Sequence, residues 1–203
     1  MNFITALLLS TSANLDTFAV AISYGIKKIK LSLFNILLIT LITTTGTFIS
    51  MYFGLAFTKI ISVDIAAIIG SVMLIGIGLY MILDYYKKPK SKNETLVEDK
   101  LTYSQILDNP IKADKDSSGD LDFKESITLS LALTINNLGI GVAASIAGIN
   151  IYLNTICTLI ITLLSIILGS SIGNSYLSKF FGKYSGLVSG LIIVALGIYE
   201  CFM

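Results

Sequence analysis

Residues 85–125, YYKKPKSKNETLVEDKLTYSQILDNPIKADKDSSGDLDFKE, form the one long polar stretch of the chain. They hold nine of the thirteen acidic residues and eight of the fourteen lysines, whereas the 53 residues from 126 to 178 contain no charge. One helix of that length would be about 80 Å long, so the charge-free run must fold back, and Gly148-Ile149-Asn150 is the expected turn. The sequence therefore predicts two apolar segments, residues 1–84 and 126–203, on either side of a polar linker, residues 85–125.

Composition places both segments in a membrane. Hydrophobic residues make up 54% of the chain and charged residues 13%, and the mean hydropathy is +0.83. These values are typical of an all-α polytopic membrane protein. Six spans are long enough to cross a hydrocarbon core about 30 Å thick: Phe3–Ile26, Ser32–Thr58, Val63–Asp84, Ile127–Ile149, Ile151–Asn174 and Ser185–Met203.

Several functions are excluded or disfavoured by residue content. The chain has no histidine, which excludes nucleophile–histidine catalysis and histidine-ligated zinc. It has no glycine-rich phosphate loop ending in Lys-Ser or Lys-Thr, and its net charge of +1 gives no reason to expect nucleic-acid binding. We therefore expect neither an enzyme nor a protein that requires a cofactor.

Lysine placement predicts the orientation. With six spans, thirteen of the fourteen lysines fall in three loops on one side, and only Lys59 falls on the other. Because positive charge collects on the cytoplasmic side, we expect a multi-pass protein of the cell membrane, with residues 85–125 cytoplasmic and both termini external.

The two apolar segments are related in sequence. Residues 16–22, DTFAVAI, match residues 136–142, NNLGIGV, at an offset of 120. Near the end of each segment, residues 78–80, GLY, match residues 197–199, GIY, at an offset of 119. Because the first span enters the cytoplasm and the fourth leaves it, this relation predicts two inverted repeats of three helices each.

Asp16 is the only acid near the centre of a span. Burying a charged carboxylate there is costly unless a cation or partner compensates. We expect Ser12, Asp16, Ala19 and Ser23, at spacings of four, three and four, to lie along one helical face made mostly of small residues.

The matched face of the fourth span carries Asn136. Small faces allow close helix approach, so we expect spans one and four to cross and to bring Asp16 and Asn136 together. The alternative is that Asp16 only fastens the two halves, protonated or hydrogen-bonded to Asn136. Further oxygens could come from Asn14, Thr17, Asn137, Thr43, Thr44 and Thr45.

A second candidate site lies at the end of the polar linker. Residues 114–125 fit a twelve-residue calcium-loop template, with glycine at its sixth position and an aliphatic residue at its eighth. Such a loop can hold Ca²⁺ or Mn²⁺. The alternative is that its last residues only cap the following helix, and Asn109-Pro110 interrupts any helix before it. The expected ligands are Asp114, Asp116, Ser118, Asp120, Asp122 and Glu125.

At these residues the chain resembles the manganese efflux pump (MntP) family and, within it, the YtaF-type sporulation membrane proteins. The resemblance is carried by NLDTFAV, residues 14–20, and by LALTINNLG, residues 131–139. Asn109-Pro110 and ADKDSSG, residues 113–119, look like the YtaF type in particular. The resemblance implies six helices in an inverted repeat, a mid-membrane acid in each half, and cation export. Asp16 matches the first acid, whereas Asn136 stands in the place of the second and is neutral, which weakens attraction for a divalent cation.

Two functions remain open on the sequence alone. The leading hypothesis is secondary transport of a divalent cation, manganese above all, around Asp16 and Asn136, with protons as counter-ion. The other is a sporulation-associated membrane sensor or scaffold that does not transport and whose cytoplasmic loop binds a cation. The partners expected are a divalent metal cation, protons and the lipid bilayer. Assembly into a homo-oligomer is left open.

Overall fold

The computed structural model describes residues 3–59, 63–87, 113–114, 118–172 and 176–202. Within these residues the regular structure is helical, apart from one isolated parallel bridge between Lys30 and Asp120. This confirms an all-helical fold for the described part of the chain. The helices are α1 (Phe3–Ala13), α2 (Leu15–Lys27), α3 (Leu33–Thr58), α4 (Val63–Lys87), α6 (Phe123–Ile146), α7 (Ile151–Ile172) and α8 (Tyr176–Cys201).

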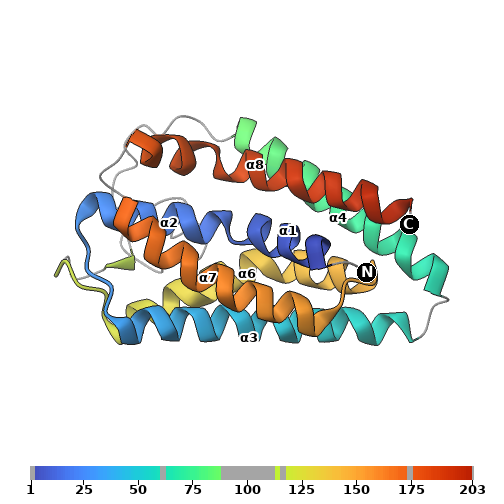
Figure 1. The fold of residues 1–203 in the computed structure, drawn as a ribbon, viewed down its shortest axis with the longest axis horizontal. Coiled ribbons are helices and arrows are strands. Elements are labelled where there is room, and N and C mark those ends of the chain that lie inside the picture. The colour runs from blue at the N-terminus through green and yellow to red at the C-terminus, as the bar shows by residue number, and fades with distance from the viewer. Residues whose placement is uncertain (1–2, 60–62, 88–112, 115–117, 173–175, 203) are drawn as a thin grey trace.

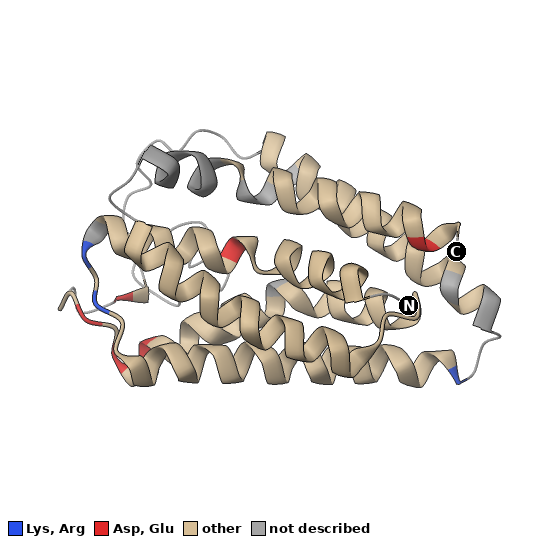
Figure 2. Cartoon of the chain, viewed as in Figure 1, with Lys and Arg blue, Asp and Glu red and all other residues tan. Residues whose placement is uncertain are grey.

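The bundle buries polar side chains beside an apolar core, and its outer surface is apolar. The buried face of α3 carries Thr40, Thr43, Thr47 and Ser50, whereas Leu33 on the same helix is 78% exposed. Large apolar side chains are exposed on the other helices as well. Charged residues gather toward the ends of the bundle and are sparse along its length (Figure 2). Because exposed apolar area on this scale is unfavourable in water, the surrounding medium is lipid and the chain is a membrane protein.

Helix length and composition identify between two and four membrane spans among the described residues. α3 and α7 qualify alone. The pair α1 and α2 qualifies as one bent span, and so does α6, whose two parts meet at an angle. In α4 and α8 the apolar stretches, Ile68–Leu83 and Leu187–Cys201, are shorter than a full span.

The turns between helices have clear local causes. The chain leaves α6 through Gly148, whose φ of 90° suits glycine, and Asn150 Oδ1 accepts a hydrogen bond from the N–H of Leu153 at 3.0 Å, which caps α7. The turn predicted at residues 148–150 is therefore confirmed. Before α3, Ser32 Oγ accepts from the N–H of Asn35 at 3.1 Å.

Packing joins each helix to one from the other half of the chain. α1 and α2 run alongside α7, since Asn14 contacts Thr162 and Ala21 contacts Gly169. α3 runs parallel to α6 and α4 antiparallel to α8, and the two termini lie at the same end of the bundle (Figure 1). The interior polar groups therefore lie at contacts between the two halves.

Close approach of α4 and α8 depends on glycine. A Cβ atom at Gly78 would lie 2.7 Å from the main-chain oxygen of Gly190, too close for any side chain. On the same helix, a Cβ atom at Gly76 would have no neighbour within 4 Å. These two glycines provide a matched pair for measuring what this contact contributes to stability.

We expect Gly78→Ala to destabilise the folded protein by about 1–3 kcal/mol, because the added methyl group forces the two helices apart. Gly76→Ala should be neutral or stabilising by up to about 1 kcal/mol, since alanine favours a helix. The measurement is unfolding by sodium dodecyl sulfate of the purified protein in detergent micelles. Equal stability of the two variants would contradict the α4–α8 contact described here.

Candidate cation site at a helix break

The first apolar span is broken next to Asp16. α1 ends at Ala13 and α2 begins at Leu15, and the two axes differ by 43°. Asn14 stands at the break, 2% exposed, and its Nδ2 donates to the main-chain oxygen of Ser10 at 2.8 Å. Asparagine side chains compete in this way with helical backbone bonds, and no proline or glycine is needed. The expected face through Ser12 and Asp16 is therefore wrong as a continuous helical face, because the bend separates the two residues.

Asp16 lies in the first turn of α2 and is half-buried. Its Oδ1 accepts a hydrogen bond from the N–H of Thr17 at 2.6 Å and lies 3.4 Å from Thr17 Oγ1. The amino end of a helix favours negative charge. The break therefore gives the carboxylate a polar environment inside an otherwise apolar span, and this is the setting that intramembrane cation sites use.

The second half is bent near the corresponding position, at residue 136, two residues beyond Thr134, which the offset of 120 matches to Asn14. The axes of Phe123–Ile135 and Asn137–Ile146 differ by 41°. The Asn137 side chain is 5% exposed, and its Oδ1 has no hydrogen-bond partner among the described residues. The Asn136 side chain lies outside the described part of the structure, so its expected approach to Asp16 stays a prediction.

The three consecutive threonines of α3 that were expected to add oxygen ligands do not all face the interior of the bundle. Thr43 donates to the main-chain oxygen of Ile39 at 2.8 Å. Thr44 is buried, and its Oγ1 has no partner within the described residues. Thr45 is exposed on the outside of the bundle, so its expected contribution of a ligand is wrong. Thr17, by contrast, is 2% exposed and lies beside Asp16.

Polar groups on α7 were not predicted, although they face the break. Thr162 Oγ1 donates to Asn14 Oδ1 at 2.6 Å. One and two turns earlier on α7, Thr158 and Asn154 hydrogen-bond to Ser10. Their spacing of four residues was the available signal, since it places all three α7 residues on one helical face.

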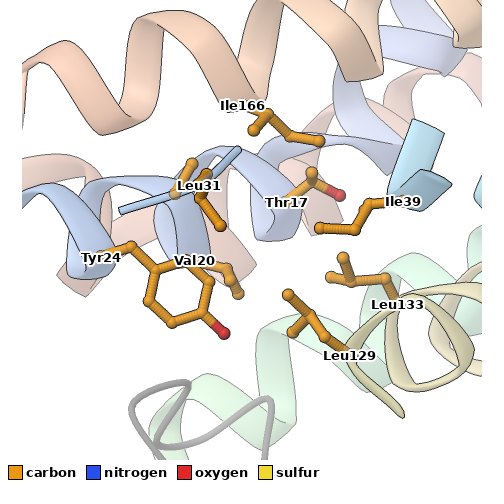
Figure 3. A pocket seen from close by; sticks show the side chains of 9 residues that line it. Thr17, Val20, Tyr24, Leu31, Ile39, Leu129, Leu133 and Ile166 are labelled. Atoms are coloured by element: carbon orange, nitrogen blue, oxygen red, sulfur yellow. The ribbon is translucent and has the colours of Figure 1, made fainter. Parts of the chain in front are cut away.

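An apolar plug separates this polar region from the end of the bundle where α2 stops. A cavity of about 10 Å³, room for one water molecule at most, is lined there almost wholly by hydrocarbon side chains (Figure 3). Thr17 supplies the hydroxyl on one side of it, and the Tyr24 ring lies on another (Figure 3). The other labelled lining residues are Val20, Leu31, Ile39, Leu129, Leu133 and Ile166.

The loop of residues 114–125 is partly described. Asp114 is buried, and its two carboxylate oxygens accept the N–H groups of Ser118 at 3.1 Å and Gly119 at 3.2 Å. Gly119 has a φ of 81°, which explains why glycine stands at this point of the turn. Main-chain hydrogen bonds join Lys30 to Gly119 and Leu121, which fastens the loop to the α2–α3 connection.

The end of the loop caps α6. Asp122 and Glu125 form a capping box, and the N–H of Asp122 donates to Glu125 Oε2 at 3.0 Å. Capping is therefore confirmed, and cation binding stays a prediction. Among the described residues no three histidine, cysteine or acidic side chains are grouped as a metal site. Glu125 is buried, Ser118, Asp120 and Asp122 are exposed, and Asp116 lies outside the described residues.

Comparisons with known proteins find one matching family model and one similar curated protein. A family model described as "Putative manganese efflux pump" matches residues 100–199. The chain is 33% identical over 157 residues to the "Probable sporulation protein YtaF" of Bacillus subtilis (strain 168), and the alignment covers 73% of this chain and 75% of that protein. No solved structure matches the chain.

Proposed function

The chain belongs to the manganese efflux pump (MntP) family, and from that premise we propose that it carries a divalent cation, manganese above all, across the membrane. Transport is secondary and centres on the helix break beside Asp16. The observation that carries this proposal is a half-buried carboxylate in the first turn of a broken helix, inside a bundle with an apolar outer surface. A carboxylate so placed is stable when it is protonated or neutralised by a cation.

We further propose that the full fold has six spans in two inverted repeats, residues 1–84 and 126–203, joined by the linker of residues 85–125. The offset of 119 carries Gly78 to Gly197 and Ser71 to Gly190. Gly78 lies against Gly190, and Gly197 lies against Ser71. Replacing each residue of one contact by its counterpart in the other half therefore gives the other contact. A two-fold axis between the halves requires this.

A second pair of contacts supports the same relation. The offset of 120 carries Ala21 to Gly141, and the offset of 119 carries Ser50 to Gly169. Gly169 lies against Ala21, and Gly141 lies against Ser50. The bends of 43° and 41° also fall within two residues of matching positions, at residues 14 and 136 for an offset of 120. α1 begins at the end of the bundle that carries the termini, whereas α6 begins at the opposite end, which supports inversion (Figure 1).

The cation would be held by oxygen atoms around the two bends. Asp16 supplies the charge. Asn14 and Thr17 are buried polar residues next to it along the chain, and Asn137 is the buried residue that the offset of 120 matches to Thr17. Oδ1 of Asn137, which has no hydrogen-bond partner among the described residues, favours this role, because a buried oxygen without a donor is costly unless it is satisfied in another state. With Asn136 neutral, one carboxylate alternates between a metal cation and a proton, and this makes protons the natural counter-ion.

The orientation completes the proposal. The lysine-rich side, including residues 85–125, is cytoplasmic, and both termini are external. The apolar plug around Val20, Ile39 and Leu133 then lies between Asp16 and the cytoplasm. In this state the site is closed toward the cytoplasm, and opening requires α2, α3 and α6 to separate.

A second candidate function is a membrane sensor or scaffold that does not transport. The neutral Asn136 favours it, as do the calcium-loop template of residues 114–125 and the word "sporulation" in the name of the relative. The loop would hold Ca²⁺ or Mn²⁺ on the cytoplasmic side. Its bonds to Lys30 would pass a change in the loop to the α2–α3 connection.

We expect Asp16→Asn to fold and insert normally but to lose manganese flux by at least about tenfold, because an ion pair even at an effective dielectric constant near 20 is worth several kcal/mol. Asn136→Asp should raise the flux by creating a second carboxylate. The measurement is manganese flux through purified protein in liposomes, with far-ultraviolet circular dichroism as the control for folding.

A packing role for Asp16 makes the opposite prediction, since the neutral amide keeps its size and hydrogen bonding and is cheaper to bury. Normal flux in Asp16→Asn would therefore overturn the proposed site. Absence of flux in both the parent protein and Asn136→Asp would favour the sensor or scaffold.

For the loop, we expect Glu125→Gln to weaken Ca²⁺ or Mn²⁺ binding severalfold, because it removes one charge and the bidentate contact that closes the ligand shell. Isothermal titration of the whole purified protein measures this, with Asp16→Asn as background in both samples so that the membrane site does not contribute. Equal binding with and without the Glu125 carboxylate would leave helix capping as its role.

A further inference from the structure

A second group of donor atoms lies beyond the helix break, toward the end of the bundle that carries the termini. Ser10 Oγ donates to Asn154 Oδ1 at 3.0 Å and accepts from Thr158 Oγ1 at 3.2 Å. Asn154 Nδ2 lies 3.2 Å from Met51 Sδ. The four side chains come from α1, α3 and α7, and none is more than 3% exposed. Three oxygen atoms and one thioether sulfur thus converge in a buried cluster between three helices.

The matching interface in the other half is arranged differently. The offset of 120 makes Ser130 and Thr134 the counterparts of Ser10 and Asn14. Thr134 donates to the main-chain oxygen of Ser130 at 2.7 Å, and Ser130 in turn donates to that of Ser126. Both hydroxyls therefore hydrogen-bond to main-chain oxygens of their own helix, α6. The methyl group of Thr134 packs against Gly46 of α3. At these matched positions, among the described residues, hydroxyl and amide groups bond across helices at the α1–α7 interface and within the helix on α6.

The cluster is close to Asp16 along the chain. Ser10 and Asp16 are six positions apart in the sequence, a distance of roughly 9 Å along a helix. Asn14 lies between them in the sequence. Its Nδ2 donates to the main-chain oxygen of Ser10, and its Oδ1 accepts from Thr162 of α7. A cation that leaves Asp16 toward the termini would meet the cluster next, still within reach of the carboxylate's charge.

The donor atoms suit some cations better than others. Ca²⁺ and Mg²⁺ are hard cations that prefer oxygen ligands. A thioether is a soft ligand that suits copper and zinc best. Mn²⁺ prefers oxygen ligands, but it accepts a single sulfur ligand more readily than Ca²⁺ and Mg²⁺ do. Without a carboxylate of its own, the cluster would hold a divalent cation weakly, which a site of passage requires.

We propose that Ser10, Asn154, Thr158 and Met51 form a second cation subsite on the outward path, and that Met51 selects transition-metal divalent cations over Ca²⁺ and Mg²⁺. This inference rests on the proposed transport function. The hydroxyl groups turn their lone pairs toward the passing cation, and the Asn154 amide offers Oδ1. The hydrogen bond from Asn154 Nδ2 to Met51 Sδ breaks, and the sulfur then binds the cation.

The test compares Met51→Leu with Met73→Leu. Leucine and methionine have similar volumes, so packing is largely kept. Met73 is a fair control because it packs against the same apolar cluster as Met51 but is only partly buried. Manganese flux into liposomes is measured while Ca²⁺ or Cd²⁺ is added as competitor, and the concentration that halves the flux is recorded for each protein.

We expect Met51→Leu to be inhibited by Ca²⁺ at severalfold lower concentration than the parent, and by Cd²⁺ at severalfold higher concentration, since Cd²⁺ favours sulfur. Met73→Leu should behave as the parent. A general loosening of the bundle would shift both competitors in the same direction, so opposite shifts identify the sulfur as a ligand.

Unchanged competition in Met51→Leu, or the same shifts in Met73→Leu, would overturn the subsite while leaving transport at Asp16 intact. Should Met51→Leu fail to fold, Thr158→Val removes one donor oxygen at nearly constant volume. It should raise the manganese concentration that gives half-maximal flux, and an unchanged value would overturn the proposal. Absence of manganese flux in the parent would instead overturn the proposed function itself.

Discussion

The burial of one carboxylate, that of Asp16, is the constraint on which the rest of the structure depends. The bundle presents apolar side chains to its surroundings, and charged residues are sparse along its length. A carboxylate within such a bundle needs hydrogen-bond donors, a helix terminus or a cation. The break at Asn14 supplies the first two, because it brings the amino end of α2 next to Asp16. A cation or proton supplies the remaining charge.

Polar groups elsewhere in the interior follow from the same constraint. Because lipid offers no hydrogen bonds, a buried hydroxyl or amide is stabilised by a partner within the protein, and most of those in the described interior have one. On α3 and α6 these partners are mostly main-chain oxygens of the same helix. At the α1–α7 interface they are side chains of the facing helix, such as Thr162 for Asn14. Side-chain pairs of this kind can be exchanged for a passing cation without unwinding a helix, which favours the α1–α7 interface as the path.

Much of the architecture could be predicted from the sequence. Apolar content and the long charge-free run indicated a polytopic helical protein, and Gly148 marked a turn because it suits a positive φ. The helix break could not be predicted in the same way, since many asparagines bond to their own helix without breaking it, and the bond from Thr162 of α7 to Asn14 Oδ1 depends on tertiary packing. The role of Asn154 was missed for a related reason. Polar residues in an apolar helix often bond within the helix, and only the packing of α1 on α7 shows that Asn154 bonds to Ser10.

Manganese entry into liposomes that contain the purified parent protein, followed by quenching of an enclosed metal-sensitive dye, tests the central claim most directly. We predict flux that saturates with manganese concentration, exceeds that of protein-free liposomes, and rises when a proton gradient is imposed in the opposite direction. Flux equal to that of protein-free liposomes at every manganese concentration would contradict transport by this chain.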